Sequence, residues 1–202
     1  MPRRTKEQAA ETRERIITSA LDMFSRKGYS NTTLSDIARQ IGLTKGAVYW
    51  HFKNKSDLLA ELIIYYGDKF YSDIMEMKPN SISEFRELIN KAAHTLVNEK
   101  QAQKFEFLCH FQIEWSAEFL AEVHEKLTEL REDPKTKFSQ TLANLQKLGQ
   151  IRKDVDIEIL TYSLVTLWCG TLHLALLKRI SFDMFLKILM ENFDLIIEHY
   201  SA

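Results

Sequence analysis

The sequence predicts an all-α protein, made of a small N-terminal helical unit and a larger helical body. Only six Gly and three Pro occur among the 202 residues, which leaves long stretches without helix-breaking residues. Apolar residues recur at helical spacing along most of the chain, and no segment shows the alternation of a half-buried strand. With 45% hydrophobic and 27% charged residues, the composition excludes a disordered or collagen-like chain.

The first two helices are bounded by capping residues. Apolar spacing predicts a helix over about 11–26, with Gly28 just past its end as a C-cap. Thr33 and Asp36 have the spacing of a capping box, in which each side chain satisfies a free backbone N–H group. They predict a short second helix that stops at Gly42.

Two more helix starts follow within a few residues. Thr44 can cap a third helix that contains Val48, and Asn54 with Asp57 can cap a fourth that carries Leu58. Four helix starts in so short a segment predict a compact helical unit.

The body is predicted to consist of longer helices. Asp133-Pro134 should interrupt or restart the pattern, because Pro lacks the N–H group that a helix interior needs. Asp154 and Asp156 can cap the helix that follows. The expected segments are 81–100, 103–130, 135–148, a long uncharged helix over 159–177 and a last helix that starts near Ser181.

Charge is divided unevenly along the chain, although the total is close to neutral at −1. Residues 1–60 carry 11 Lys and Arg against 6 Asp and Glu, whereas residues 61–202 carry 16 against 22. A basic head on an acidic body predicts an anionic partner for the head. Together with the helix pattern, this division predicts two domains, 1–54 and 55–202.

One segment has nearly the length of a membrane span. Ile159 to Leu177 is a run of 19 residues without Lys, Arg, Asp or Glu. The run carries several Thr, Ser, Tyr and His side chains, however, and a helix that is apolar all round can be buried between neighbours. We expect a core helix that also meets a second subunit, with a membrane span as the alternative.

The termini and cysteines predict a cytoplasmic protein. The basic N-terminal residues are not followed by an apolar stretch, so no secretory signal is predicted. Cys109 and Cys169 lie 60 residues apart in apolar surroundings, which fits reduced, buried thiols better than a disulfide framework. Neither cysteine belongs to a metal-ligand spacing.

The most informative spacing is formed by Ala38, Gly42 and Val48. A helix-turn-helix needs a small residue where its helices meet, Gly in the turn and an apolar residue inside the second helix. Thr44-Lys45-Gly46 then presents a hydroxyl, a long cation and bare backbone at the N-terminal end of that helix. Recognition helices use their N-terminal residues in the major groove of DNA. The same spacing also occurs in plain helical corners.

Residues 11–63 resemble the DNA-binding domain of TetR-type repressors. The resemblance is carried by TTLSDIARQIGLTKGAVYWHFKNKSDLL, above all by its YWHFKNK block, and it is similar to the multidrug-efflux (AcrR-like) branch. It covers about the first third of the chain firmly, and the remainder matches only in the order and length of helices.

The resemblance implies roles for individual residues. Residues 34–41 would form the positioning helix and residues 45–51 the recognition helix. The phosphate contacts would be Thr33, Tyr49, His51 and Lys55, and the residues facing bases would be Thr44, Lys45 and Gly46. Physical chemistry agrees, because a cation at a helix start suits a phosphate and Lys can donate to the O6 and N7 atoms of guanine.

Two aromatic residues near the recognition helix and the basic N-terminal residues are expected to have other roles. Trp50 and Phe52 are interpreted as core side chains that fix the recognition helix, rather than as DNA contacts. Arg3, Arg4 and Lys6 either reach phosphate or the minor groove as an arm, or form a solvated tail.

For the body, the resemblance implies an effector cavity and a homodimer formed by the last two long helices. Ten of the twelve Phe residues lie beyond residue 61, and a cavity for a small hydrophobic or amphiphilic effector needs such aromatic walls with a few polar groups. Each candidate could instead be plain core. The wall candidates are Phe107, Phe111, Trp115, Phe138, Leu142 and Trp168, and the polar candidates are His110, Glu114 and Tyr162.

No enzyme motif is present. The sequence contains no G-x-x-x-x-G-K-[ST], G-x-G-x-x-G, G-x-S-x-G or H-E-x-x-H. His110 and Glu114 share a helix face, but a metal site in a bundle needs matching ligands from other helices. We therefore expect a DNA-binding regulator without cofactor or metal. The alternatives are a helical metalloenzyme and an architectural or co-regulatory DNA-binding protein without an effector.

Overall fold

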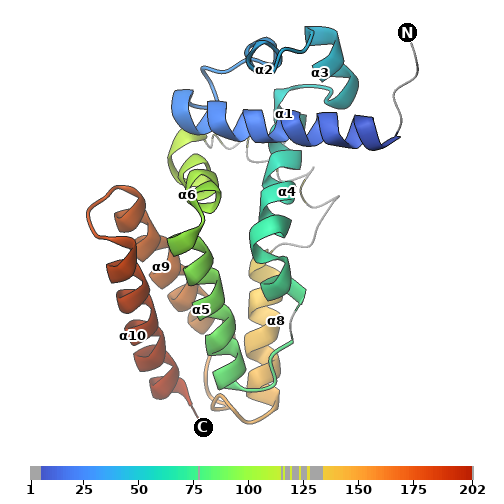
Figure 1. The fold of residues 1–202 in the computed structure, drawn as a ribbon. Coiled ribbons are helices and arrows are strands. Elements are labelled where there is room, and N and C mark those ends of the chain that lie inside the picture. The colour runs from blue at the N-terminus through green and yellow to red at the C-terminus, as the bar shows by residue number, and fades with distance from the viewer. Residues whose placement is uncertain are drawn as a thin grey trace. The chain divides into compact units, whose positions relative to one another are not determined.

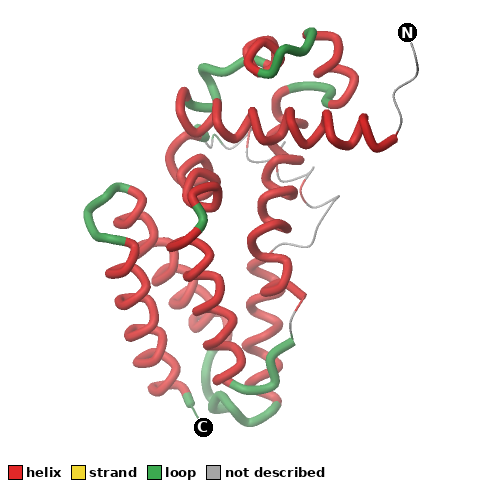
Figure 2. Tube along the Cα trace, in the orientation of Figure 1, coloured by secondary structure: helices red, strands yellow, loops and turns green. Residues whose placement is uncertain are grey.

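The structure, a computed structural model, describes residues 6–76, 78–114, 116, 119, 123, 127 and 134–201. Helices joined by short loops account for most of these residues (Figure 2). They contain no strand, and Ile151 and Ser201 form one isolated antiparallel bridge. The all-α prediction is confirmed.

The chain divides into two compact units. The first comprises the described residues of Met1–Gly67 and Lys104–Arg131, and the second those of Asp68–Gln103 and Glu132–Ala202. The first boundary lies inside the long helix α4 (Lys55–Glu76), because its early turns pack on the head and its later turns on the body. The functional division at residue 54 stays a prediction.

The head of the first unit consists of α1 (Lys6–Lys27), α2 (Leu34–Gln40), α3 (Lys45–His51) and the start of α4. Both short helices lie on the same side of α1 (Figure 1). The predicted bounds of the second and third helices are confirmed to within one residue, whereas α1 begins earlier than position 11.

Apolar side chains from all four helices form the core of the head. The fully buried members are Ile16, Ile17, Ala20, Phe24, Ile37, Val48, Phe52, Leu58, Leu59 and Leu62. Phe52 is therefore a core residue, as predicted. The same prediction is wrong for Trp50, whose exposed fraction is 73%. Val48 faces the core, and position 50 lies about 200° further round the helix, so its side chain points outward.

The first unit also contains the π-helix η1 (Leu108–Gln112) and the part of α6 (Lys100–Phe107) that begins at Lys104. The backbone N–H of Tyr29 donates to the carbonyl of Gln112 at 2.9 Å, which joins η1 to the turn after α1. The helix predicted over 103–130 thus starts earlier and changes its winding at Leu108. Most of its later part, including Trp115, lies outside the described residues.

The second unit contains α5 (Ile82–Asn98), α8 (Pro134–Lys147), α9 (Ile157–Leu176) and α10 (Phe182–Tyr200). Helices α9 and α10 lie side by side, with α5 against α10 and α8 against α9 (Figure 1). Ser81, Asp156 and Ser181 cap their helices, and α8 begins at Pro134, so the predicted starts are confirmed.

Helix α9 is only partly covered. It is long and apolar enough to cross a membrane, but one third of its apolar window is buried within the chain. Leu160, Leu164 and Leu172 face the core, while Ile159 and Leu174 are exposed. A large uncharged surface is thus left on this helix.

The prediction of buried thiols is wrong for Cys169. Cys169 is exposed on α9 and Cys109 is partly exposed on η1, and neither forms a disulfide. Cys169 lies on the uncharged outer face of α9, so apolar neighbours in the sequence did not mean burial. Burial of the Cys109 sulfur nevertheless raises the pKa of its thiol well above the ordinary value.

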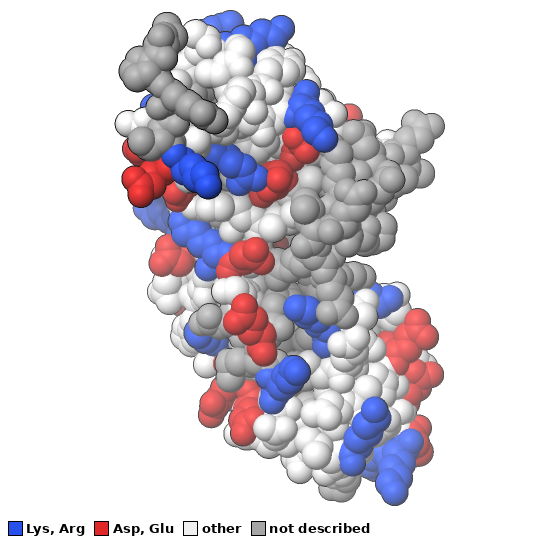
Figure 3. Space-filling model, turned by 90° about the vertical axis from the view of Figure 1, so that its right-hand side faces the viewer, with Lys and Arg blue, Asp and Glu red and all other residues white. Residues whose placement is uncertain are grey.

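Charges of both signs are interspersed over the face shown in Figure 3. The basic excess of the first 60 residues therefore does not form one continuous basic patch on this face.

Candidate nucleic-acid interface

The turn between α2 and α3 is fixed by hydrogen bonds and by one glycine. Gly42 has φ +69°, a conformation that other residues adopt only with strain. The N–H of Leu43 donates to the carbonyl of Ala38 at 2.9 Å, which closes the end of α2. Arg15 on α1 donates to the carbonyl of Ile41 at 3.2 Å. The turn therefore sets the direction of α3 relative to both preceding helices.

The N-terminal end of α3 brings four predicted DNA-binding residues to the surface. The Thr44 hydroxyl caps the helix by accepting from the N–H of Ala47 at 3.2 Å. Thr44, Lys45, Gly46 and Tyr49 are all exposed. The Lys45 ammonium lies 5.4 Å from the centre of the Tyr49 ring. A hydroxyl, a cation, bare backbone and a phenol thus share one exposed surface.

Trp50 extends this surface and was missed by the sequence interpretation. Its ring packs edge-on against the ring of His51, with centroids 4.6 Å apart. A helical wheel centred on Val48 could have found it, because position 50 cannot share the buried side. The large exposed ring gives α3 an apolar group beside the polar ones.

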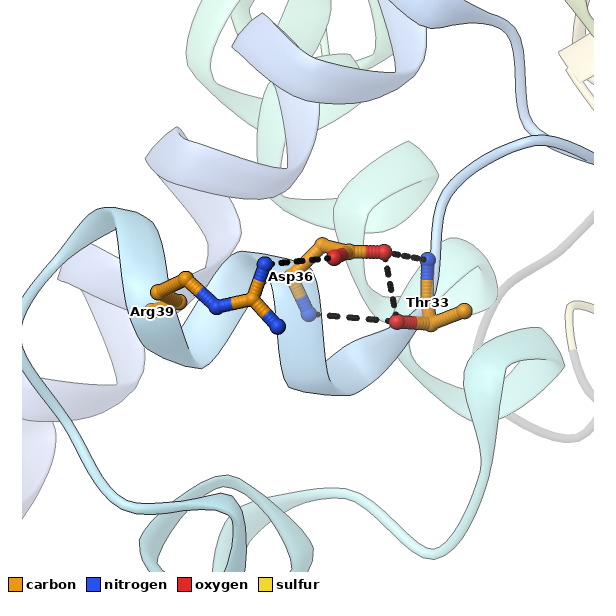
Figure 4. A network of polar contacts seen from close by, with 3 residues as sticks. All are labelled: Thr33, Asp36 and Arg39. Atoms are coloured by element: carbon orange, nitrogen blue, oxygen red, sulfur yellow. Dashed lines mark hydrogen bonds and ion pairs between the residues drawn. The ribbon is translucent and has the colours of Figure 1, made fainter.

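Thr33 begins α2 as a capping residue (Figure 4). Its hydroxyl donates to Asp36 at 2.6 Å and also accepts from the Asp36 N–H at 3.1 Å. The hydrogen bonds from Thr33, followed by the charge of Arg39, hold the pKa of the Asp36 carboxyl below its usual value. The hydroxyl proton of Thr33 is thus directed toward the Asp36 carboxylate.

Lys55 is also held within the protein. Its ammonium donates to the carbonyl of Tyr29 at 2.9 Å and to that of Ser30 at 3.4 Å. It lies 4.2 Å from the centre of the Tyr29 ring. Burial lowers the pKa of Lys55. This side chain ties the start of α4 to the turn between α1 and α2.

The predicted effector residues are divided between the two units. Phe107, His110, Phe111 and Glu114 belong to the first unit, where α6 passes into η1. The rings of Phe107 and Phe111 lie 5.2 Å apart, and the His110 Nε2 lies 3.6 Å from a carboxylate oxygen of Glu106. These side chains form a local aromatic and polar group.

The remaining effector candidates belong to the second unit. Leu142 is fully buried in the core. The ring centroids of Phe138 and Phe85 lie 5.2 Å apart, and those of Trp168 and Phe185 lie 5.8 Å apart. Tyr162 is instead exposed on α9, where the ammonium of Lys135 lies 4.3 Å from its ring centre. Three of these four residues therefore lie in or against the core of the second unit.

The second unit also contains a polar hollow of about 330 Å³. None of the described wall candidates is among its lining residues, which come from α4, α5 and the start of α6. Its lining residues are Lys69, Phe70, Ser72, Lys91, Thr95, Glu99 and Gln101. Over the part of the chain that the structure describes, no group of three His, Cys, Asp or Glu side chains could hold a metal ion.

Known structures share this fold. NalD, the secondary repressor of the MexAB-OprM multidrug efflux pump in Pseudomonas aeruginosa, superposes with a TM-score of 0.79 at 24% identity, over 98% of this chain and 99% of that one. SmeT in complex with triclosan superposes with a TM-score of 0.77 at 24% identity, over 95% and 92% of the two chains. At these identities the likeness concerns the fold.

Sequence similarity identifies the family. Residues 16–62 match the family of bacterial regulatory proteins named after TetR. The probable HTH-type transcriptional regulator ArpR of Pseudomonas putida is 31% identical over 166 residues, which cover 78% of this chain and 77% of that protein. The exposed end of α3 and this similarity lead to one conclusion: the chain belongs to the TetR family, whose members are DNA-binding transcriptional regulators and not enzymes.

Proposed function

We propose that this protein is a repressor that binds operator DNA as a homodimer and is released by a small hydrophobic or amphiphilic effector. The observation that carries the proposal is the exposed group of Thr44, Lys45, Gly46 and Tyr49 at the start of α3. Side chains at this end of a recognition helix reach base edges, and the helix N-terminus favours phosphate. Such a regulator acts in the cytoplasm, where bacterial DNA lies.

The uncovered faces of α9 and α10 support the homodimer. Their exposed apolar side chains are Ile159, Tyr162, Leu174, Met184 and Leu195. Exposed apolar side chains of this kind are stabilised when a second copy covers them, and a two-fold pair buries the same side chains on both copies. Analytical ultracentrifugation should give a dimer, and Leu174→Glu with Leu195→Glu should give monomers.

A two-fold dimer carries two recognition helices. They should enter successive major grooves about 34–36 Å apart, or a multiple of that distance, so the operator should be nearly palindromic. Sequencing of DNA fragments bound by the purified protein tests this. A single asymmetric half-site in the footprint would contradict the dimer.

Lys45 is proposed to read bases rather than to position the protein. Its exposed ammonium can donate to guanine, so Lys45→Ala should chiefly relax the base preference at one position of each half-site. Repeated selection from random DNA with the variant measures this. Recovery of an unchanged operator would contradict the base contact.

An effector that acts on the body supports the repressor mechanism. Helix α4 is one continuous helix from the head into the second unit, so a ligand that displaces its later turns can alter the separation of the two heads. A relative, SmeT, has been solved with triclosan, and NalD represses a multidrug efflux pump. We propose that this chain likewise controls an efflux system.

The proposed release of DNA by an effector can be tested by measuring how ligand and operator affect the binding of each other. Ligand and operator must weaken each other by the same factor, typically ~5 to 150-fold. The affinity for triclosan would be measured by calorimetry with and without operator DNA. The variant Phe111→Ala should bind the ligand more weakly and should bind DNA with unchanged affinity. Equal ligand affinity in both states, for triclosan and for a series of cationic amphiphiles, would favour an architectural protein without an effector.

A further inference from the structure

The outer face of α9 carries a stripe of exposed residues without a charge. Its members recur at the three- and four-residue spacing of one helix face, opposite the buried side of the helix. They are Tyr162, Thr166, Cys169, Gly170, His173, Leu174 and Leu177. This stripe belongs to the surface that the proposed homodimer covers.

The middle of the stripe holds two side chains that bind metal ions in other proteins. Cys169 and His173 are four residues apart, so they lie one turn apart on the same side of α9. Two ligands at this spacing on a helix can bind one Zn²⁺ together. A thiolate and an imidazole are ligand types that Zn²⁺ prefers, and Cys169 forms no disulfide.

One chain supplies only half of a structural zinc site, which needs four ligands. Among the described residues no group of three His, Cys, Asp or Glu side chains could hold a metal ion. A metal site in a helical bundle takes matching ligands from other helices, and a two-fold axis supplies the same pair from a second copy. The doubled set contains two Cys and two His, which is one of the common ligand sets of structural zinc.

Gly170 lies between the two ligands and favours a close approach of the copies. Glycine weakens a helix interior relative to alanine, and a Cβ at Gly170 would meet nothing within 4 Å, so packing within the chain does not require glycine there. A bare backbone at this point lets another helix come close. Where a helix crosses its own two-fold copy, the crossing lies at the axis. A crossing at Gly170 therefore brings Cys169 and His173 of both copies together.

We propose that the homodimer binds one Zn²⁺ between the two copies of α9, through Cys169 and His173 of both chains. The proposal rests on the homodimer of the proposed function. Four protein ligands leave no open position on the metal, so the site is structural and not catalytic. The metal holds the two copies together and thereby keeps the recognition helices as a pair.

Co²⁺ is the probe that tests the ligand set, because its absorption spectrum reports tetrahedral geometry and thiolate ligation. It would be titrated into the purified full chain, with a phosphine reductant present so that no disulfide forms. We expect about one Co²⁺ per two chains, a thiolate-to-cobalt band, and displacement of Co²⁺ by Zn²⁺. Cys169→Ser and His173→Gln should each lower the affinity by more than about 100-fold, the largest usual cost of removing a partner outside the ligand shell.

The matched controls are Cys109→Ser and His199→Gln. They remove the cysteine of the first unit and an exposed histidine of α10, and both should bind Co²⁺ as the unchanged protein does. Because only the dimer carries the complete site, Zn²⁺ at 100 times its dissociation constant should lower the dissociation constant of the dimer about 100-fold. Analytical ultracentrifugation with and without Zn²⁺ measures this change, which should be absent in Cys169→Ser.

A dimer that binds no Co²⁺, or that binds it equally well after Cys169→Ser or His173→Gln, would overturn the metal site. Equal loss of Co²⁺ binding in the control variants would mean an adventitious ion only and would overturn it as well. A chain that stays monomeric with and without Zn²⁺ would instead refute the proposed homodimer. The two failures are therefore distinguishable.

Discussion

The two units of this chain present their candidate functional residues in opposite ways. In the first unit, Lys45, Gly46 and Trp50 are exposed on a short helix. In the second unit, Leu142 is fully buried and Trp168 packs on a core ring. A DNA surface requires exposed groups at fixed positions, which local helix geometry supplies. An effector cavity forms where some core side chains border a space that no other side chain fills. Only the packing of the complete chain determines where such a space lies.

The largest expected difference between the units is in stability. Leu142→Ala removes a fully buried side chain and should lower the free energy of unfolding by about 2–5 kcal/mol. Trp50→Ala should change it by less than about 0.5 kcal/mol, because the ring is exposed, yet it should weaken DNA binding. Urea denaturation and DNA titration measure the two quantities. A Leu142→Ala variant of unchanged stability that binds effector less tightly would place Leu142 on a cavity wall instead.

Two glycines of the head separate folding from recognition. Gly42→Ala forces Ala into a positive φ and should cost about 1–2 kcal/mol. Gly46 lies in α3 without a positive φ, and a Cβ there would meet nothing within 4 Å, so Gly46→Ala should stabilise the helix by up to about 1 kcal/mol.

DNA affinity should fall in both glycine variants, in Gly42→Ala through misplacement of α3 and in Gly46→Ala through the added methyl at the DNA surface. Melting temperatures measured beside DNA titrations distinguish the two causes. A Gly46→Ala variant with full DNA affinity would remove that backbone from the interface.

Tyr65 should make the first unit sensitive to alkaline pH. Burial, and then the hydrogen bond to Glu14, raise the pKa of Tyr65 to about 12. The unfolded chain loses this proton near pH 10, so the stabilisation is complete below that pH and is lost as the pH rises from about 10 to 12. Burial also raises the pKa of Tyr66, so ultraviolet difference titration should show late-ionising tyrosines, one fewer of them in Tyr65→Phe. Ionisation of all tyrosines near pH 10 would contradict the burial of this group.

The smallest effect is expected for the ion pair between α5 and α10. The Nη2 atom of Arg86 donates to the Oδ2 atom of Asp194 at 2.8 Å, and the two side chains are 43% and 47% exposed. A pair of such exposure should contribute at most about 1 kcal/mol, as measured by a double-mutant cycle with Arg86→Ala and Asp194→Ala. A coupling of several kcal/mol would mean that a second subunit covers this surface.

The sequence alone was sufficient where local interactions decide the structure. The capping box of Thr33 and Asp36, the positive φ of Gly42 and the bounds of α3 follow from nearest neighbours along the chain. The same short-range signals carried the resemblance to the TetR family. The polar residues at the start of α3 were therefore predicted together, and the structure brings them together.

Only the tertiary structure decided which side chains are available to a partner. Trp50 and Cys169 are apolar in type yet exposed, and Lys55 is charged yet held against two carbonyls. The type of a residue determines how favourable its burial is on average. Whether the residue is buried at one position depends on what the rest of the chain packs against it. Those contacts join residues far apart in the sequence, such as Lys55 with Tyr29, so neither spacing nor composition could have determined them.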